Sequence, residues 1–142
     1  MKPFDYFINK RELNKIAPDF ELAKSLLSEV ETRIEIAFEM QINEKRARVV
    51  FELLYDSIRE LIDVILACDG FKSYSHEANI SYLKNFKEFQ EVEIMELDRF
   101  RKIRIGSKYY GKPAQLEDAL NIKEVFPIVK EKLMKIIKNK LK

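Results

Sequence analysis

The chain has few residues that form disulfides or break helices, and it has no segment that could anchor it in a membrane. Its 142 residues include one cysteine, which excludes an internal disulfide framework and a cysteine-based zinc site. Only three glycines and four prolines occur, and this favours long uninterrupted elements over tight turns. There is no secretory leader and no apolar run long enough to span a bilayer, so we expect a cytoplasmic protein without a membrane partner.

The composition otherwise describes one ordinary globular domain. Hydrophobic residues make up 46% and charged residues 35% of the chain, a balance typical of a globular surface with many ion pairs. We therefore expect a single domain over residues 1–142. The formal net charge of +2 is too small to indicate nucleic-acid binding by itself. One histidine, His76, cannot build a histidine-based metal site, and we predict neither a metal nor a cofactor.

Hydrophobic periodicity predicts two long helices in the first half of the chain. Asp19 can cap the first helix, whose apolar residues recur at spacings of three and four. The second is expected to begin after Asn43 and to end at Asp69-Gly70, where glycine favours a helix stop. Its apolar stripe is wide, which predicts a central helix buried on two sides, and surplus apolar surface there favours a homodimer.

Three further helices are predicted downstream. They cover roughly residues 75–86, 91–108 and 115 to near the terminus, with Pro127 either kinking the last helix or opening a separate segment. No segment alternates with a strand period for long enough to matter. We therefore expect an all-α fold, an antiparallel bundle of five to six helices with the two long helices before Gly70 as its spine.

The most unusual stretch runs from Arg99 to Lys112, carries no acid, and ends in two tyrosines and a glycine. Its basic residues are Arg99, Arg101, Lys102, Arg104, Lys108 and Lys112. Acids fill the preceding half of the same helix, and this gradient complements the helix dipole without any ligand. Asp98 also reaches Arg101 and Lys102 at spacings of three and four, pairs worth about 0.2–0.5 kcal/mol.

Arg104 departs from that simple interpretation. It continues the apolar row of Leu97 and Phe100, so its stem is expected at the edge of the buried face. A guanidinium there needs a planar or anionic partner. We expect Arg104 to be partly buried and to share a cleft with Tyr109 or Tyr110 and with a carboxylate or tyrosine of the second long helix.

Together with the segment 73–83 upstream, this tract resembles the HEPN family of helical domains. The hallmark of that family is an arginine followed, after four to six residues, by a histidine. Arg104 matches the arginine, and by spacing Tyr109 stands in the histidine place. The ending Tyr109-Tyr110-Gly111 resembles a subgroup of archaeal HEPN-like proteins. The similarity covers roughly residues 45–140 and implies a HEPN-like fold and a homodimer with its motif helices near the two-fold axis.

The resemblance also implies a function. In HEPN ribonucleases the arginine stabilises phosphate charge and the histidine serves the attack of a ribose 2′-hydroxyl. A phenol has an ordinary pKa near 10, against about 6.5 for imidazole, and is a poor proton shuttle at neutral pH. The resemblance therefore implies an RNA- or nucleotide-associated protein without efficient nuclease activity. It further suggests a toxin–antitoxin or RNA-related system and a nucleotidyltransferase-like partner protein.

Two alternatives stay open. One is a metal-independent, toxin-type ribonuclease in which Arg104 acts with Tyr109, Lys108 or His76. The other is a purely structural helical interaction module. The candidate catalytic residues, if the protein is active, are Arg104 and Tyr109. The candidate binding residues are Arg101, Arg104, Lys108, Tyr110, Tyr55 and Arg59.

Three further features have both a structural and a functional interpretation. His76 either lies in a helix start capped by Ser73 or Ser75, or folds close to Arg104. A polar stripe on the second long helix is either an exposed ion-paired face or, through Tyr55, Asp56 and Arg59, the wall of the Arg104 cleft. That stripe comprises Arg48, Glu52, Asp56, Arg59 and Asp63. The lysine-rich end, residues 130–142, either suits the helix dipole or binds polyanions, and the lack of aromatic residues among its lysines favours the first.

Overall fold

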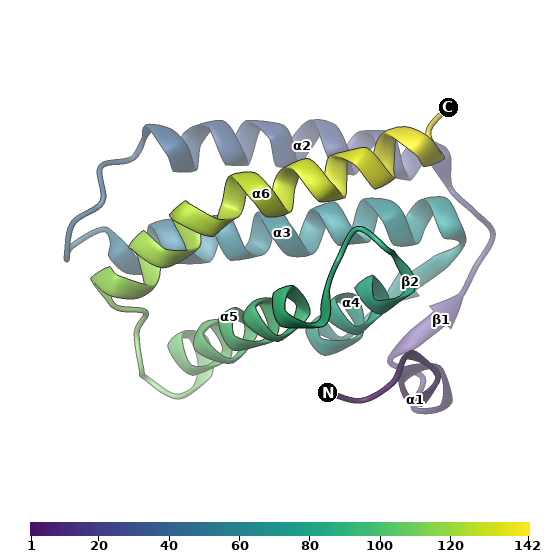
Figure 1. Cartoon of the computed structure of the whole chain (residues 1–142), viewed down its shortest axis with the longest axis horizontal. Coiled ribbons are helices and arrows are strands. Elements are labelled where there is room, and N and C mark those ends of the chain that lie inside the picture. Colours follow the sequence, from purple (N-terminus) through teal and green to yellow (C-terminus); the bar gives the residue numbers. More distant parts are fainter.

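The structure is a computed structural model that describes residues 1–142, and it consists of six α-helices, one 3₁₀ turn and two short strands (Figure 1). The elements are α1 (Phe4–Asn9), β1 (Leu13–Lys15), α2 (Phe20–Glu39), α3 (Ala47–Asp69), β2 (Phe71–Ser73), α4 (His76–Tyr82), the 3₁₀ turn (Leu83–Asn85), α5 (Glu91–Tyr109) and α6 (Leu116–Lys140). The predicted all-α bundle of five to six helices is confirmed. No helix combines the length and the apolar character that crossing a membrane would require.

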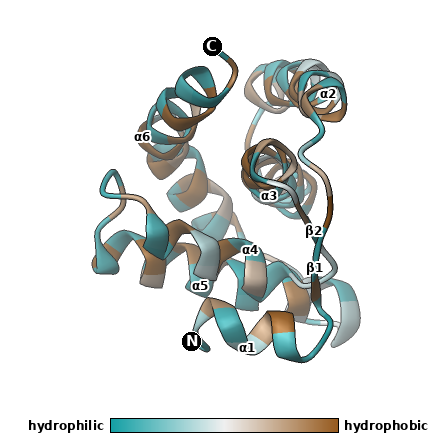
Figure 2. Cartoon of the chain, turned by 90° about the vertical axis from the view of Figure 1, so that its right-hand side faces the viewer, coloured by the Kyte–Doolittle hydropathy of each residue, from teal (hydrophilic) through white to brown (hydrophobic).

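Helix α3 is the centre of the bundle. It forms an antiparallel hairpin with α2, and α6 packs along another of its sides in the same direction as α3 (Figure 1). The layer of α4 and α5 covers a further side, as the view along the helices shows (Figure 2). The spine is α3, which packs against α2 in the hairpin that the sequence suggested and also against α6 and the α4–α5 layer.

The additional apolar side chains of α3 are buried by other helices of the same chain. Of its 23 residues, 14 are buried, and Cys68 packs among them as a small apolar side chain. Val49 is the one large apolar residue of α3 that stays exposed, at 47%. Because α2, α4, α5 and α6 cover the rest, the surplus gives no reason for a dimer, and the homodimer remains a prediction from the resemblance alone.

Helix ends follow the capping residues, with one exception. The side chain of Asp19 accepts the Leu22 N–H at 2.9 Å, and Gly70 ends α3 in the left-handed conformation at φ 83°. A Cβ on Gly70 would lie 2.7 Å from the Ile16 carbonyl oxygen, so this close approach also requires glycine. The predicted start after Asn43 was wrong: its side chain instead accepts the Arg46 N–H at 2.9 Å and closes a turn before α3 begins.

Two local features differ from the sequence-based expectation, and one alternative that the sequence left open is decided. Strands β1 and β2 pair antiparallel with Leu13 opposite Ser73, and at three residues each they are too short to show a strand period. Helix α4 ends at Tyr82 and continues only as a 3₁₀ turn, short of the predicted end. Pro127 lies inside a continuous α6, so it does not open a separate segment.

Candidate functional site

The first part of the basic tract is neutralised on its own helix. Arg99 Nη2 lies 2.9 Å from Glu96 Oε1, and Arg101 Nε lies 2.7 Å from Asp98 Oδ1. Lys102 Nζ is 3.5 Å from the second oxygen of Asp98. The interpretation of these cations as ion pairs along a helix is thus confirmed for all three, and they offer little free charge to a ligand.

Arg101, a candidate binding residue, faces away from the middle of the tract. Its guanidinium also approaches Glu77 of α4, with Nη2 3.7 Å from Oε1, and its side chain is only 14% exposed. Together with Tyr6 of α1 it lines a separate cavity of about 560 Å³ between the N-terminal segment and α5. Arg101 therefore joins α4 to α5 rather than extending the surface around Arg104.

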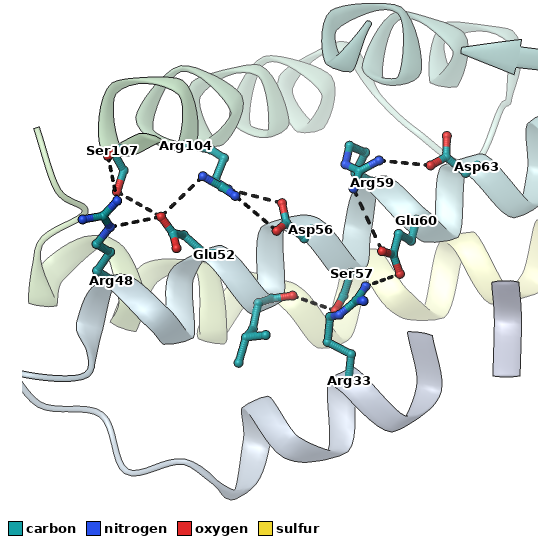
Figure 3. A network of polar contacts seen from close by, with 11 residues as sticks. Arg33, Arg48, Glu52, Asp56, Ser57, Arg59, Glu60, Asp63, Arg104 and Ser107 are labelled. Atoms are coloured by element: carbon teal, nitrogen blue, oxygen red, sulfur yellow. Dashed lines mark hydrogen bonds and ion pairs between the residues drawn. The ribbon is translucent and has the colours of Figure 1, made fainter. Parts of the chain in front are cut away.

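Arg104 lies between two carboxylates of α3 (Figure 3). Its stem continues the buried row of Leu97 and Phe100, and its side chain is 13% exposed. Arg104 Nε donates to Asp56 Oδ1 and Nη2 to Asp56 Oδ2, both at 3.3 Å. Nη1 donates to Glu52 Oε1 at 3.4 Å. The prediction of a partly buried guanidinium against a carboxylate of the second long helix is confirmed, and we call this group of three the Arg104 cleft.

The Arg104 cleft has no free positive charge. Burial alone would lower the pKa of the Arg104 guanidinium, but the hydrogen bonds and charge of Asp56, with the charge of Glu52, outweigh burial and raise that pKa. Arg48 Nε also lies 3.1 Å from Glu52 Oε1. Two arginines therefore face two carboxylates, and the four formal charges cancel.

Glu52 is also the junction of three chain segments. Besides Arg104 and Arg48, it accepts the Ser107 hydroxyl at 3.3 Å. Arg48 Nη2 donates to the Ser107 carbonyl at 3.1 Å, and the buried Ser107 hydroxyl accepts the Ala114 N–H at 3.4 Å. These bonds join the start of α3, the end of α5 and the loop before α6. Sequence reasoning placed Glu52 in the polar stripe but missed its role, and nothing in the sequence pointed to Ser107.

The other end of the polar stripe pairs with different elements. Arg59 Nη1 donates to Asp63 Oδ2 at 3.3 Å, and its Nη2 lies 4.0 Å from Glu60 Oε1 (Figure 3). Glu60 forms an ion pair with Arg33 of α2, and Asp63 accepts the Asn79 side-chain amide of α4 at 2.8 Å. Arg59 is thus held by carboxylates of its own helix, one turn beyond the Arg104 cleft.

His76 lies where α3, α4 and α5 meet. Ser75 caps α4 by accepting the Ala78 N–H at 3.2 Å, which confirms the capping interpretation for this serine. The half-buried His76 ring lies against Tyr55, with ring centroids 6.0 Å apart. Tyr55 itself is buried at 2% exposure, and burial raises the pKa of its phenol. The aromatic pair thus forms a half-buried junction beside the cleft.

The surroundings of His76 keep its imidazole neutral. Burial lowers its pKa most, and the charge of Arg59 lowers it next. Arg104 and Lys108 lower the pKa further, and Asp56 opposes them without reversing the direction. The contact that the structure gives the His76 ring is with Tyr55, so the capping interpretation is confirmed and closeness to Arg104 stays a prediction.

The end of the basic tract is different from its beginning. Lys108 and Lys112 form no ion pair, and Lys108 Nζ lies 5.3 Å from the centre of the Tyr109 ring. Tyr109 is 67% and Tyr110 71% exposed, and neither hydrogen-bonds to Arg104. Gly111 follows in the left-handed conformation at φ 63°. We call residues 108–112 the α5 tip; its two rings are exposed and form no hydrogen bond with Arg104, so a cleft shared with Arg104 stays a prediction.

Comparison with known proteins gives no relative from which a function could be transferred. No family model, curated protein or solved structure matches this chain. The structure has no group of three or more histidine, cysteine, aspartate or glutamate side chains that could hold a metal ion. The site is therefore defined by its own geometry: a neutral, half-buried cluster of ion pairs around Arg104 and, one turn further along α5, an exposed basic and aromatic tip.

Proposed function

We propose that this protein is a HEPN-like, nucleic-acid- or nucleotide-associated protein that binds its ligand with the α5 tip, backed by the Arg104 cleft. The observation that carries the proposal is that Lys108 and Lys112 lack an acidic partner and flank two exposed tyrosine rings. Unpaired cations attract phosphates, and exposed rings stack on bases without sequence preference. Basic residues interleaved with aromatic ones are therefore suited to single-stranded nucleic acid.

Efficient RNA cleavage is not part of this proposal. A phenol stands in the histidine place of the motif, and phenols are poor general bases at neutral pH. We propose a homodimer that acts in a toxin–antitoxin or RNA-related system, with a nucleotidyltransferase-like partner protein. The resemblance supports these points, and light scattering tests the first: the mass should be twice 16.9 kDa at micromolar concentration.

The decisive experiment compares tyrosines in matched surroundings. Binding of a fluorescent 12-nucleotide single-stranded RNA of mixed sequence is followed by anisotropy for wild type and for Tyr109→Ala/Tyr110→Ala. The control is Tyr74→Ala, because Tyr74 is 62% exposed and also carries a lysine, with Lys72 Nζ 5.6 Å from the centre of its ring.

If at least one base stacks on the tip at about 1–3 kcal/mol, the tip variant should lose about 5- to 150-fold in affinity, and the Tyr74 control should lose less than twofold. Equal losses in the two proteins would mean that the tip is not the contact surface. Circular dichroism of each variant checks that the helices are intact.

One observation favours a second candidate, a metal-independent ribonuclease. His76 supports this candidate as a half-buried acid–base group that feels the charge of Arg104, and Arg104 could stabilise a phosphate once Asp56 releases it. Mixed RNA is incubated with chelator and with wild type, Arg104→Ala or His76→Asn protein. Cleavage lost in both variants selects the ribonuclease, and binding without cleavage selects the first proposal. If the protein neither cleaves nor binds RNA, the structural interaction module is the alternative that remains.

A further inference from the structure

We infer that Asp56 is a specificity-determining residue that occupies Arg104 as an internal anion, and that a ligand phosphate reaches Arg104 only by displacing it. This inference rests on the proposed function. In the closed state, which the structure describes, the Asp56 carboxylate binds Arg104. In the open state, phosphate oxygens of the ligand replace that carboxylate.

The geometry of the closed state explains the competition. Asp56 uses both carboxylate oxygens on Nε and Nη2 of Arg104, each at 3.3 Å. This is the two-nitrogen edge through which a guanidinium makes its bidentate contact with phosphate. The remaining terminal nitrogen is directed to Glu52 at 3.4 Å. An incoming anion therefore finds no free edge of the guanidinium.

The two carboxylates are not equally easy to displace. Glu52 accepts from Arg48, Ser107 and Arg104, so it is fixed by three donors from two helices. The Asp56 side chain hydrogen-bonds to Arg104 alone and is 26% exposed, so water can replace its partner when it leaves. Asp56 is therefore the carboxylate that moves, and Glu52 keeps Arg104 in position.

A displaced Asp56 carboxylate stays within the field of a second arginine, Arg33. The pKa of Arg33 on α2 is raised, first by its hydrogen bond to Glu60 and also by the charge of Asp56. The Asp56 side chain is also 26% exposed, so water solvates it when it turns away. The carboxylate can therefore turn away from Arg104 without becoming an isolated buried charge, which keeps the open state accessible.

Competition by Asp56 determines which ligands succeed. A free phosphate ion comes from dilute bulk solution and must displace the Asp56 carboxylate. A strand already held at the α5 tip, by contrast, presents its next phosphate at high effective concentration. The cleft should therefore discriminate against small anions and accept a chain that the tip has bound first.

The test removes the charge of Asp56 while keeping its shape. Asp56→Asn should bind the 12-nucleotide RNA about 3- to 10-fold more tightly than wild type, because the internal competitor is weakened and a like charge is removed. Glu131→Gln is the matched control: it changes net charge equally, from an exposed position on α6 without an ion pair, and should change affinity less than twofold. Inorganic phosphate should compete with the RNA more effectively on Asp56→Asn than on wild type.

The double variant Asp56→Asn/Arg104→Gln locates the effect, because the gain should disappear when Arg104 is absent. Asp56→Asn that binds no more tightly than wild type overturns the inference, and so does a gain that persists without Arg104. If wild type binds RNA in a tip-dependent way and Asp56→Asn gains nothing, only the inference falls. If no variant binds RNA, the proposed function falls with it.

Discussion

Arg104 lies on α5 and the α5 tip lies at the end of that helix and just beyond it, within eight residues, yet their charges have opposite environments. The Arg104 guanidinium is half-buried and held by two carboxylates. Lys108 and Lys112 are exposed and unpaired, beside two exposed rings. The comparison shows that consecutive basic residues differ in whether their charge can bind a ligand. That charge is neutralised where a residue faces the acids of a neighbouring helix.

The largest expected effect concerns the cleft side of this comparison. Glu52→Ala removes the acceptor shared by Arg48, Arg104 and Ser107 and should lower the free energy of unfolding by about 2 kcal/mol. Urea unfolding measures the loss. Lys108→Ala at the tip should change stability by less than about 0.5 kcal/mol. Equal effects of the two substitutions would erase the distinction between cleft and tip.

The tip should dominate the electrostatics of binding. Lys108→Gln/Lys112→Gln should weaken binding of the single-stranded RNA about tenfold at low salt and reduce the slope of log K against log salt by about 1 to 2. The control is Lys135→Gln/Lys138→Gln on α6, which removes the same charge from another exposed surface. If the control lowers the slope as much as the tip variant does, binding is governed by net charge alone.

Arg104→Lys separates geometry from charge within the cleft. Lysine cannot satisfy Asp56 and Glu52 together as the planar guanidinium does, so stability should fall by about 1 kcal/mol, or about 2–4 °C in Tm. RNA affinity should fall about threefold while circular dichroism stays unchanged. A lower Tm with unchanged affinity would assign Arg104 a purely structural ion pair.

The smallest effect is a pH dependence from His76. Its folded-state pKa is lowered, so as pH falls below about 6.5 the unfolded chain takes up a proton that the folded protein does not, and stability is lost. The Tm of wild type should therefore fall more steeply between pH 7.5 and pH 5 than that of His76→Gln. Parallel curves for the two proteins would show that the imidazole is not perturbed by its surroundings.

Much of the fold could be predicted from the sequence because local signals agreed with tertiary packing. Asp19 and Gly70 marked real helix ends, and the wide apolar stripe of α3 correctly indicated a central helix. The short strands could not be predicted, since three residues carry no usable period. The start of α3 was misplaced because Asn43 caps a turn as readily as a helix, and only the following geometry decides between them.

The candidate site was predictable in part. The row through Leu97 and Phe100 predicted how deeply Arg104 is buried, and the polar stripe supplied its carboxylate partners. The separation of the tyrosines from Arg104 was not predictable, because it depends on where α5 ends relative to α3. The contribution of Ser107 was hidden for the same reason: a serine becomes informative only when folding brings it against Glu52.

The most direct test of the account is an NMR titration of the isotope-labelled protein with the 12-nucleotide RNA, following every backbone amide. The account predicts the largest shifts at residues 108–112, smaller shifts at Asp56 and Arg104, and little change along the lysine-rich half of α6. Shifts concentrated on α6, with the tip unchanged, would contradict the claim that the unpaired end of α5 is the binding surface.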